Sequence, residues 1–420
     1  MERVLIPFAH EKIALDIPEK NLLKVLKSNP QDMSLGENEV MAQGMNNPIG
    51  TKRLSELAKP GQKVAIVTSD ITRPMPTYKV LPWVLDELNQ AGVADEDITV
   101  VFALGSHRAH TEEEKKKLVG EEIYNRVKCI DSKDDFVHMG VTKRGTPVDI
   151  FRPVAEADFR ICLGNIEFHY FAGYSGGVKA IMPGVSSRDA IQCNHRFMVQ
   201  EAAKAGNLQG NPIREDIEEV GNDFVHVDFI VNVVLDEQKR IVHCVAGHYQ
   251  QAHRAGCRLL DGMYKVSIPQ KADIVVVSAG GYPKDLNLYQ AQKALDNAKH
   301  AVKEGGRILW AASAAEGLGE KTFMHWMTSH EKASDMITHI AEDFQLGGHK
   351  AAAIAMVLQN AQIYLYSDLD AEVVRKGHLH PCDDLQAALD ESLALYGEDA
   401  KVIVMPYGGS TLPCLEEAAE

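Results

Sequence analysis

The stretch EFHYFAGYSGGVKAIMPGVSSRDAIQCNH, residues Glu167–His195, follows a short apolar run and leads toward a second one. Its glycine-rich turn surrounds Ser175 and Gly177, and turns of this kind at a helix start present backbone amides that bind anions such as phosphate. Lys179 follows directly, as a candidate phosphate partner or nucleophile. His169 and His195 lie too far from it along the chain to share a helical turn. Only tertiary folding would bring these groups together.

Outward from this stretch, apolar and β-branched runs alternate with polar loops and helical segments. Such runs are typical of buried parallel strands, and ligands of open α/β sheets collect at the carboxyl ends of those strands. The expected strands are Lys63–Thr68, Ile98–Leu104 and Phe159–Leu163. The loops after them, Ser69–Pro74, Gly105–His110 and the opening stretch, are therefore expected to face one cleft.

The first two loops each have a plainer interpretation. Asp70 or Thr72 would also serve as the cap of a following helix. In the second loop Thr111 and Glu114 have capping-box spacing, so a helix is expected to begin there, after His107. Because no carboxylate is in register with His107 and His110, this pair is a weak metal signal.

Further along, the apolar run Ala272–Ala279 predicts another strand, and a helix is expected over Leu288–Val302. On this helix Tyr289, Gln290 and Lys293 are three or four residues apart and share a face. Together they offer one cation and neutral hydrogen-bond donors, which suit the binding of an α-hydroxy carboxylate. A helix face that is simply exposed to solvent has the same pattern of residues.

Composition excludes several classes of protein. The chain has 420 residues, 45% hydrophobic and 25% charged, with a net charge of −15 and no basic stripe, so no nucleic-acid partner is expected. Its seven scattered cysteines never form CxxC, which argues against a disulfide framework or a thiolate zinc site. We expect no signal peptide and no membrane association, because no apolar run is long enough to span a bilayer, and hence a cytoplasmic protein. No GxGxxG follows an expected strand, which argues against a conventional NAD dehydrogenase.

The string HYFAGYSGGVKAIMPGV followed by NH closely resembles the signature of the nickel-dependent lactate racemase family. Three further motifs, SDITRP, GSHR and YQAQK, occur in the order expected for that family. Together they cover both halves of the chain, and the chain is identified as a member on this resemblance.

The resemblance implies a cofactor site. Lys179 would be bonded covalently to a nickel-pincer nucleotide, pyridinium-3,5-bisthiocarboxylic acid mononucleotide, and His195 would ligate the nickel. The family also has the motif matching Asp70, Ile71, Thr72 and Arg73 at the cofactor and substrate, with Ser175 and Gly177 in the cofactor loop.

It further implies the catalytic and substrate residues. His107 and His169 would be the two acid/bases; His107 is the match rather than His110 because it directly follows the Gly105-Ser106 turn. Gln290 and Lys293 would contact the substrate, with Tyr289 nearby.

The expected fold class is α/β with two domains, each a mostly parallel or mixed sheet flanked by helices, and with the active site in the interdomain cleft. The expected boundaries are 1–268 for a cofactor-binding catalytic domain and 269–404 for an α/β domain with substrate contacts, while 405–420 would return to the first domain. Other expected elements are strands at Arg3–Ala9 and Lys12–Ile17, a helix over Glu39–Leu57, a hairpin of Phe224–Leu235 with Arg240–Ala246, and a helix over Tyr249–Met263.

Racemisation of a 2-hydroxy acid requires both proton-transfer groups and groups that hold the carboxylate. Removing the Cα proton of a 2-hydroxy carboxylate would create a dianionic enolate, whereas removing hydride gives a planar 2-oxo acid that accepts hydride on either face. Two imidazoles suit the proton transfers, and Arg73 with Lys293 and Gln290 would hold the carboxylate. The chain is thus predicted to racemise a small 2-hydroxy acid, lactate first, with cofactor-synthesis enzymes as partners. Alternatives are a larger acid, including C2 epimerisation of a sugar acid, and a nonenzymatic nucleotide or metal carrier.

Overall fold

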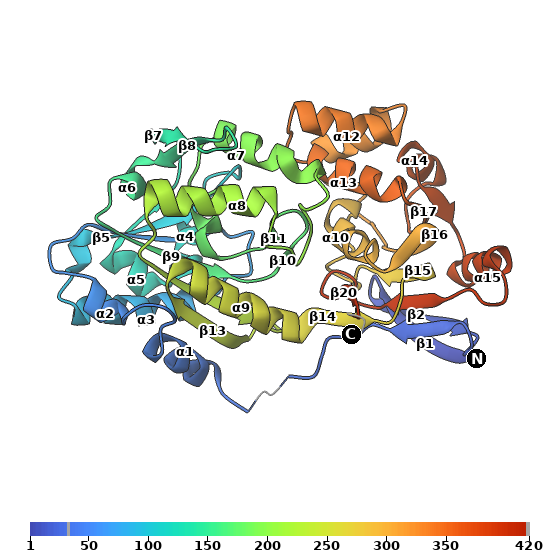
Figure 1. Cartoon of the computed structure of the whole chain (residues 1–420), viewed down its shortest axis with the longest axis horizontal. Coiled ribbons are helices and arrows are strands. Elements are labelled where there is room, and N and C mark those ends of the chain that lie inside the picture. Colours follow the sequence, from blue (N-terminus) through green and yellow to red (C-terminus); the bar gives the residue numbers. More distant parts are fainter. Residues whose placement is uncertain (32–33, 417–420) are drawn as a thin grey trace. The chain divides into compact units, whose positions relative to one another are not determined.

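The computed structural model describes residues 1–31 and 34–416. It divides the chain into two compact units, one made of residues 31–261 and the other of residues 1–30 together with 262–420. Each is an α/β unit built on a six-stranded sheet (Figure 1). The expected fold class, mostly parallel or mixed sheets flanked by helices, is therefore confirmed for each unit.

The unit of residues 31–261 is built on a mixed sheet in the strand order β13-β12-β9-β4-β5-β6. All neighbouring pairs are parallel except β12 with β13, which form an antiparallel hairpin. The strands are β4 (Val64–Ser69), β5 (Ile98–Ala103), β6 (Lys128–Asp131), β9 (Phe159–Asn165), β12 (Phe229–Leu235) and β13 (Ile241–Gly247). The three strands predicted to precede functional loops are adjacent in this sheet, in the order β9-β4-β5.

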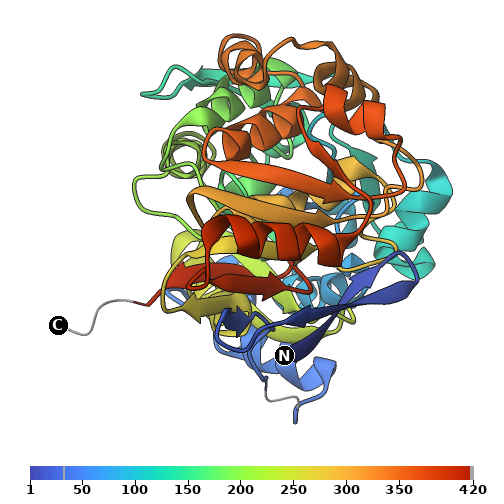
Figure 2. The same cartoon turned by 90° about the vertical axis from the view of Figure 1, so that its right-hand side faces the viewer.

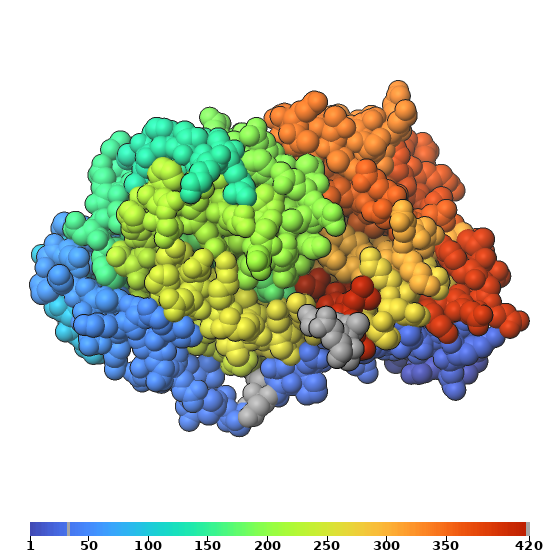
Figure 3. All heavy atoms as spheres, viewed as in Figure 1, coloured from blue at the N-terminus to red at the C-terminus, as the bar shows by residue number. Residues whose placement is uncertain are grey.

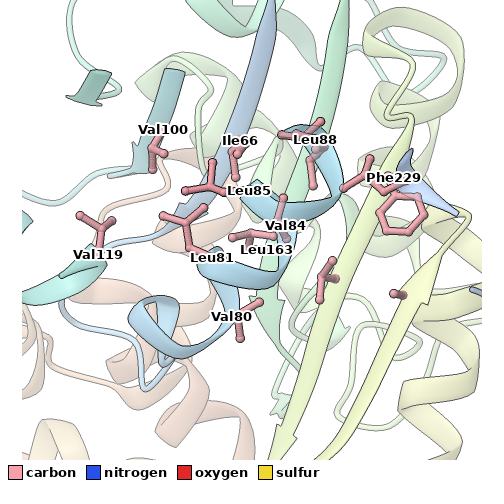
Figure 4. Close-up of a cluster of buried hydrophobic side chains, with 14 of the residues drawn as sticks. Ile66, Val80, Leu81, Val84, Leu85, Leu88, Val100, Val119, Leu163 and Phe229 are labelled. Atoms are coloured by element: carbon pink, nitrogen blue, oxygen red, sulfur yellow. The ribbon is translucent and has the colours of Figure 1, made fainter. Parts of the chain in front are cut away.

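One face of this sheet is covered by α3 (Thr77–Gln90), whose apolar residues recur at helical spacing (Figure 4). The side chains Val80, Leu81, Val84, Leu85 and Leu88 point at Ile66, Val100, Leu163 and Phe229 of four neighbouring strands, and all of these residues are fully buried. Burial of this kind contributes about 25 cal/mol per Å² of apolar surface. The core therefore holds the strand ends, and the loops that leave them, at a defined position.

The remaining elements of this unit surround the sheet. They are α1 (Glu37–Asn46), α2 (Leu54–Leu57), η1 (Asp95–Asp97), α4 (Glu112–Val119), α5 (Glu121–Arg126), β7 (Phe136–Val141), β8 (Pro147–Phe151), α6 (Arg152–Ala155), β10 (Phe168–His169), β11 (Gly173–Tyr174), η2 (Gly177–Ala180), α7 (Arg188–His195), η3 (Arg196–Val199), α8 (Pro212–Glu219), η4 (Val220–Val225) and α9 (Tyr249–Tyr264). The predicted capping box of α4 is present, because Thr111 and Glu114 exchange side-chain hydrogen bonds with each other's backbone amides.

Two predicted elements are wrong in their extent. The helix expected over Glu39–Leu57 is two helices, α1 and α2, because Pro48 lacks an amide and the next residue, Ile49, instead forms a bridge with Gly247 beside β13. The strand expected from Phe224 begins only at Phe229, because residues 220–225 form η4 and His226 then adopts a left-handed conformation.

The other unit contains a fully parallel sheet in the order β18-β17-β16-β15-β19-β3 (Figure 2). Its strands are β3 (Leu22–Val25), β15 (Ala272–Ser278), β16 (Val302–Ala311), β17 (Ala361–Tyr366), β18 (His380–Cys382) and β19 (Val402–Met405). Its helices are α10 (Leu288–Ala298), α11 (Lys321–Ser329), α12 (Ala333–Glu342), α13 (Gly348–Leu358), α14 (Ala371–Lys376) and α15 (Leu385–Tyr396). In Figure 2, α15 (red) lies in front of the strands, and its Gln386 exchanges hydrogen bonds with the backbone of Asp16.

The N-terminal residues join this second unit rather than the one that follows them in sequence. β1 (Glu2–Phe8) and β2 (Glu11–Ile17) form the predicted hairpin, and their Ile6 and Leu15 pack in one core with Ile274 and Val404. β3 then pairs with β19 as the edge strand of the sheet. The structure thus divides the chain differently from the expected 1–268 domain, because these contacts join segments that are hundreds of residues apart.

The C-terminal residues also differ from the expectation. β20 (Leu412–Leu415) pairs with β14 (Lys265–Ile268). β14 lies inside the expected first domain, but both strands belong to the unit of residues 1–30 and 262–420. Residues 417–420 of the expected returning segment lie outside the described residues.

None of the helices in the described part of the chain is long and apolar enough to cross a membrane. The seven cysteines, all within the described ranges, are free thiols.

Candidate active site

Most of the predicted site residues lie on loops that leave the carboxyl ends of adjacent strands in the unit of residues 31–261. Asp70 follows β4, His107 follows β5, and the stretch from Glu167 follows β9. The β5 loop is tied to the opening stretch by Gly105 N–H, which donates to Gly184 O at 2.9 Å. The two loops are therefore neighbours, as the position of their strands predicts.

Asp70, Thr72 and His107 form one hydrogen-bonded group. The backbone N–H and hydroxyl of Thr72 donate to Asp70 Oδ1 at 3.1 and 2.6 Å, and Asp70 Oδ2 is bonded to Nδ1 of His107. Because a carboxylate accepts, His107 carries its proton on Nδ1 and has its lone pair on Nε2. The ring of His107 is half-buried, so Nε2 is the nitrogen suited to accept a proton.

The carboxylate of Asp70 is ionised in this arrangement. Burial by itself would raise its pKa, but the hydrogen bonds from His107 and Thr72, together with the charges of His107 and Arg73, lower the pKa overall. Asp70 is only 3% exposed. It is therefore a buried negative charge that orients His107 and stabilises a positive charge on that ring.

His110 holds the Asp70 loop from the other side. Its buried Nε2 accepts the backbone N–H of Ile71 at 3.1 Å, while Nδ1 lies 2.7 Å from Asp131 Oδ1 at the end of β6. With one nitrogen accepting and the other donating, the ring has no nitrogen left for a metal or a proton transfer. Both ring nitrogens of His110 are thus engaged, whereas His107 is bonded to Asp70 through Nδ1 alone.

The glycine-rich turn is folded tightly against the sheet. Gly176 and Gly177 have φ values of 76° and 60°, and a Cβ at Gly176 would lie 2.7 Å from Asn232 Oδ1. Gly177 N–H donates to the same Asn232 oxygen at 2.7 Å. Ser175 Oγ donates to Asn165 O and accepts from Glu167 N–H, both at 2.8 Å.

These contacts differ from the expected anion-binding turn. The amides of Ser175 and Gly177 are both engaged inside the protein, the former with Glu167 O at 2.8 Å. A side chain at Gly176 would collide with Asn232, and one at Gly177 would crowd His253, so the two glycines allow the loop that carries Lys179 to pack this closely.

Lys179 lies on η2, half-buried, next to two other cationic groups. Its pKa is well below the usual lysine value because of burial first and then the charges of Arg73 and Arg214. None of the ion pairs among the described residues involves these three side chains. This environment disfavours the protonated form of the amine.

His169 and His195 both pack against the ring of Phe171. Their ring centroids are 4.5 and 4.8 Å from that of Phe171, both in edge-to-face geometry. Nδ1 of His169 accepts the N–H of Ala172 at 3.3 Å, so the neutral ring carries its proton on Nε2, the opposite arrangement to His107.

His195, the last residue of α7, is buried and oriented through its neighbour. Nδ1 donates to Asn194 Oδ1 at 2.9 Å, and Asn194 Nδ2 in turn donates to Asp216 Oδ2 at 2.8 Å. Asp216 is fully buried and also accepts from Thr142 and Thr146. This chain of bonds sets the tautomer that leaves the lone pair on Nε2, the form that a metal ligand requires.

The predicted residues on α10 lie in the other unit. Gln290 and Lys293 are the exposed residues of this otherwise buried helix, and Tyr289 is half-buried beside them. Lys350 of α13 donates to Tyr289 O at 2.7 Å, and its ammonium lies 4.0 Å from the centroid of the Tyr289 ring. A helix that exposes only two polar residues fits a binding face better than a solvated one.

Several residues that position the site were not recognised in the sequence. They are His110, Asp131, Asn194, Arg214, Asp216, Asn232 and Lys350. His253 of α9 is buried as well, and its Nε2 donates to Ser175 O at 2.8 Å. No local pattern marks these residues, because each acts on a partner from another element.

Comparisons with known proteins give the family. The model of the lactate racemase N-terminal domain matches residues 8–206, and that of the lactate racemase C-terminal domain matches residues 268–412. The lactate racemases of Thermoanaerobacterium thermosaccharolyticum and Lactiplantibacillus plantarum are each 33% identical to this chain, over 98% and 97% of its length and 99% of theirs.

Solved structures agree with this assignment. The lactate racemase apoprotein of Thermoanaerobacterium thermosaccharolyticum superimposes with a TM-score of 0.90, at 33% identity, over 98% of this chain and 100% of that one. A protein from Thermotoga maritima at 18% identity shares the fold, with a TM-score of 0.64 over 92% of this chain and 100% of that one. The chain therefore belongs to the lactate racemase family and is an enzyme of the isomerase class.

Proposed function

We propose that the protein racemises a small 2-hydroxy acid, with lactate as the first candidate, using His107 and His169 as the two acid/bases. The observation that supports this most directly is the opposite arrangement of the two rings. His107 is bonded at Nδ1 to the Asp70 carboxylate and offers a lone pair at Nε2, whereas His169 accepts at Nδ1 from Ala172 and carries its proton on Nε2. Two histidines, one ready to accept a proton and one ready to donate a proton, suit the interconversion of the two enantiomers of a 2-hydroxy acid.

The residues fit the cofactor implied by the sequence resemblance. The described residues contain no group of three or more His, Cys, Asp or Glu that would hold a metal. His195 would therefore bind nickel only if the remaining ligands came from a bound organic group. The lowered pKa of Lys179 favours the amine that covalent attachment of that group requires, and Arg73 suits its anionic phosphate.

In this proposal a nickel-pincer nucleotide bound at Lys179 supplies the acceptor for the hydride of the substrate carbon. His107 would take the hydroxyl proton at Nε2 for one enantiomer. His169 would do so for the other in its second tautomer, which has the lone pair on Nε2 and gives up the bond from Ala172 N–H. Asp70 stabilises the protonated His107, because the buried carboxylate lies against its Nδ1. The cofactor-synthesis enzymes are the partners that this chemistry requires.

Arg73, Gln290 and Lys293 are proposed to bind the substrate, with Tyr289 supporting them. Arg73 would grip the carboxylate through two parallel N–H donors, and Lys293 would add a second cation. The two exposed polar side chains of α10 support this role. Asp70, Ile71 and Thr72 are proposed at the cofactor, and Ser175 and Gly177 contribute by folding its loop.

The test is to produce the protein together with the cofactor-synthesis enzymes, and to measure intact mass, nickel content and conversion of D- and L-lactate. A mass increase located at Lys179, with nickel and racemisation, is expected. Adduct without lactate turnover would redirect the proposal to larger 2-hydroxy acids, including sugar acids epimerised at C2. A protein that acquires no adduct under these conditions would refute the proposed cofactor role of Lys179.

A further inference from the structure

Arg214 is a fully buried arginine on α8, which is buried on one side and partly exposed at its glutamates. Residues of α8, coloured yellow-green, form part of the face shown in Figure 3. Arg214 points inward and is 0% exposed. Burial of a guanidinium is costly unless charge and donors are both satisfied, so the residue calls for an explanation.

The guanidinium is held by backbone carbonyls instead of a carboxylate. Nε donates to Ala172 O at 3.2 Å and Nη2 donates to Tyr174 O, while Nη1 has no partner among the described residues. The nearby acid, Glu218, is paired with Arg254 at 2.7 Å. Arg214 therefore keeps a positive charge that no acidic side chain neutralises by contact.

The carbonyls that Arg214 holds lie just before the lysine in the chain. Next to them, His253 donates to Ser175 O at 2.8 Å, and Asn232 accepts from Gly177 N–H at 2.7 Å. Buried side chains from α8, α9 and β12 thus fix the backbone from residue 172 to residue 177. Lys179 follows two residues later, on η2, which packs against α8.

We propose that Arg214 is a positioning residue for Lys179: it fixes the backbone turn that leads to the lysine and keeps a positive charge beside the amine, which is thereby presented as a nucleophile. This inference rests on the proposed role of Lys179 as the attachment point. Any covalent bond to Nζ requires its lone pair, which only the unprotonated amine has.

The surrounding charges support this assignment. Burial and the charges of Arg73 and Arg214 all lower the pKa of Lys179. The acids on the adjoining elements have partners of their own, since Asp70 is bonded to His107 and Thr72, and Glu218 is paired with Arg254. His253 is buried, and its pKa also lies well below the usual value because of burial and then the charge of Arg214. The buried acid of α8, Asp216, accepts hydrogen bonds from Thr142, Thr146 and Asn194.

The test measures the reactivity of Lys179 in protein without cofactor. Trace acetic anhydride is added across a range of pH, and acetylation of Lys179 is compared by peptide mass spectrometry with that of the exposed Lys12. In the wild type, Lys179 is expected to reach its maximal rate at a lower pH than Lys12. Arg214→Gln removes the charge but keeps a planar donor, and it should slow acetylation of Lys179 near pH 7 about tenfold, the effect of one pKa unit.

Two further variants distinguish the effect of the lost charge on acetylation of Lys179 from the effect of a general disturbance of the fold. Arg214→Lys keeps the charge and should retain most of the reactivity. Arg144→Met is the matched control, because Arg144 contacts the same helix but is paired with Glu215 at 2.7 Å. It should leave acetylation of Lys179 unchanged, and thermal melting of each variant shows whether it is folded.

The proposal is overturned if folded Arg214→Gln acetylates like the wild type, or if Arg214→Lys slows as much as Arg214→Gln. If Arg214→Gln does not fold, the wild type alone still tests the proposal. The same pH dependence of acetylation at Lys179 and Lys12 would refute it. Because acetylation needs neither cofactor nor turnover, its outcome is separate from that of the proposed function. A loaded wild type without an adduct would refute the latter while leaving the measured reactivity of Lys179 intact.

Discussion

The Nδ1 atom of His107 is hydrogen-bonded to a carboxylate oxygen of Asp70, which is almost completely buried. The two residues come from loops after the neighbouring strands β4 and β5, which pair in parallel register. The sheet therefore sets their separation, and the hydrogen bond sets which nitrogen of His107 faces a substrate.

Asp70→Asn should lower racemisation in cofactor-loaded enzyme about 10- to 100-fold, the usual effect of removing a residue that orients a functional histidine. The amide can still hydrogen-bond but cannot stabilise a positive ring by charge. Turnover from each enantiomer is measured by chiral chromatography. His138→Gln is the control, since it disrupts another histidine–aspartate pair, with Asp149, on an exposed histidine. Equal turnover in Asp70→Asn and the wild type would contradict the role given to Asp70.

The same variant predicts a pH dependence of stability. The pKa of Asp70 is lower in the folded protein than in the unfolded chain, so its ionisation stabilises the fold above the unfolded value of about 3.9 and this contribution is lost as pH falls through the folded pKa. The difference in unfolding free energy between wild type and Asp70→Asn should therefore shrink below about pH 4. Urea titrations at several pH values measure this difference, and a difference that grows toward acid pH would contradict the prediction.

His110→Ala and His107→Ala should affect different properties. Removing the His110 ring leaves Ile71 N–H without its acceptor and Asp131 Oδ1 without its donor, although Lys115 still pairs with Oδ2 of Asp131. This should reduce stability by about 1–3 kcal/mol and turnover only in part. Removing His107 should lower turnover about 10²- to 10⁴-fold. It also takes one hydrogen bond from the buried carboxylate of Asp70, so some stability should be lost as well. Melting curves and racemisation rates are measured for both variants. If His110→Ala were the inactive and fully stable variant, the assignment of the reactive histidine would be reversed.

Asn194→Ala should weaken nickel binding by loaded protein about 10- to 100-fold, because it removes the acceptor that sets the tautomer of His195. Nickel retained after dialysis against graded chelator is measured by elemental analysis, with His195→Ala as the reference for complete loss. Asn222→Ala, at an exposed asparagine, should retain nickel like the wild type. Normal retention in folded Asn194→Ala would show that this hydrogen bond does not support the metal.

Lys350→Met should raise the KM for lactate about 3- to 10-fold with a smaller change in kcat, because the lost hydrogen bond and cation–π contact hold Tyr289 next to Gln290. Lys350→Arg should restore part of the affinity, since it keeps the charge over the ring. Lys376→Met, which removes a surface pair with Glu372, should leave both constants unchanged. If Lys350→Met lowered kcat but left the KM for lactate unchanged, the proposed role of Lys350 in substrate affinity would be contradicted.

Deleting residues 1–30 should destabilise the unit formed with residues 262–420. β3 would no longer cover the edge of β19, and the core would lose Ile6 and Leu15. Hydrogen exchange should therefore become faster in β19 while β4 and β5 keep their protection. Faster exchange in β4 and β5 instead would mean that these residues stabilise the other unit.

Local patterns predicted much of the fold and identified the loops of the candidate site. β-branched runs predicted β4, β5, β9 and β15, because buried strands require apolar side chains on both faces. The capping box at Thr111 predicted the start of α4. In contrast, the break between α1 and α2 depends on a bridge from Ile49 to Gly247, a partner that no local window contains.

The sequence by itself determined which residue types follow which strands, and through them the family, because motif spacing and apolar periodicity are properties of neighbouring residues. Only the tertiary structure decided how those residues are used. It gives His107 and His110 different hydrogen-bond partners, and it gives the amides of Ser175 and Gly177 partners inside the protein. It also bonds Arg214 to the backbone of the loop that precedes Lys179. Hydrogen bonds and charge effects act over a few ångströms in space, between residues that are distant in sequence, so they are defined only when the chain has folded.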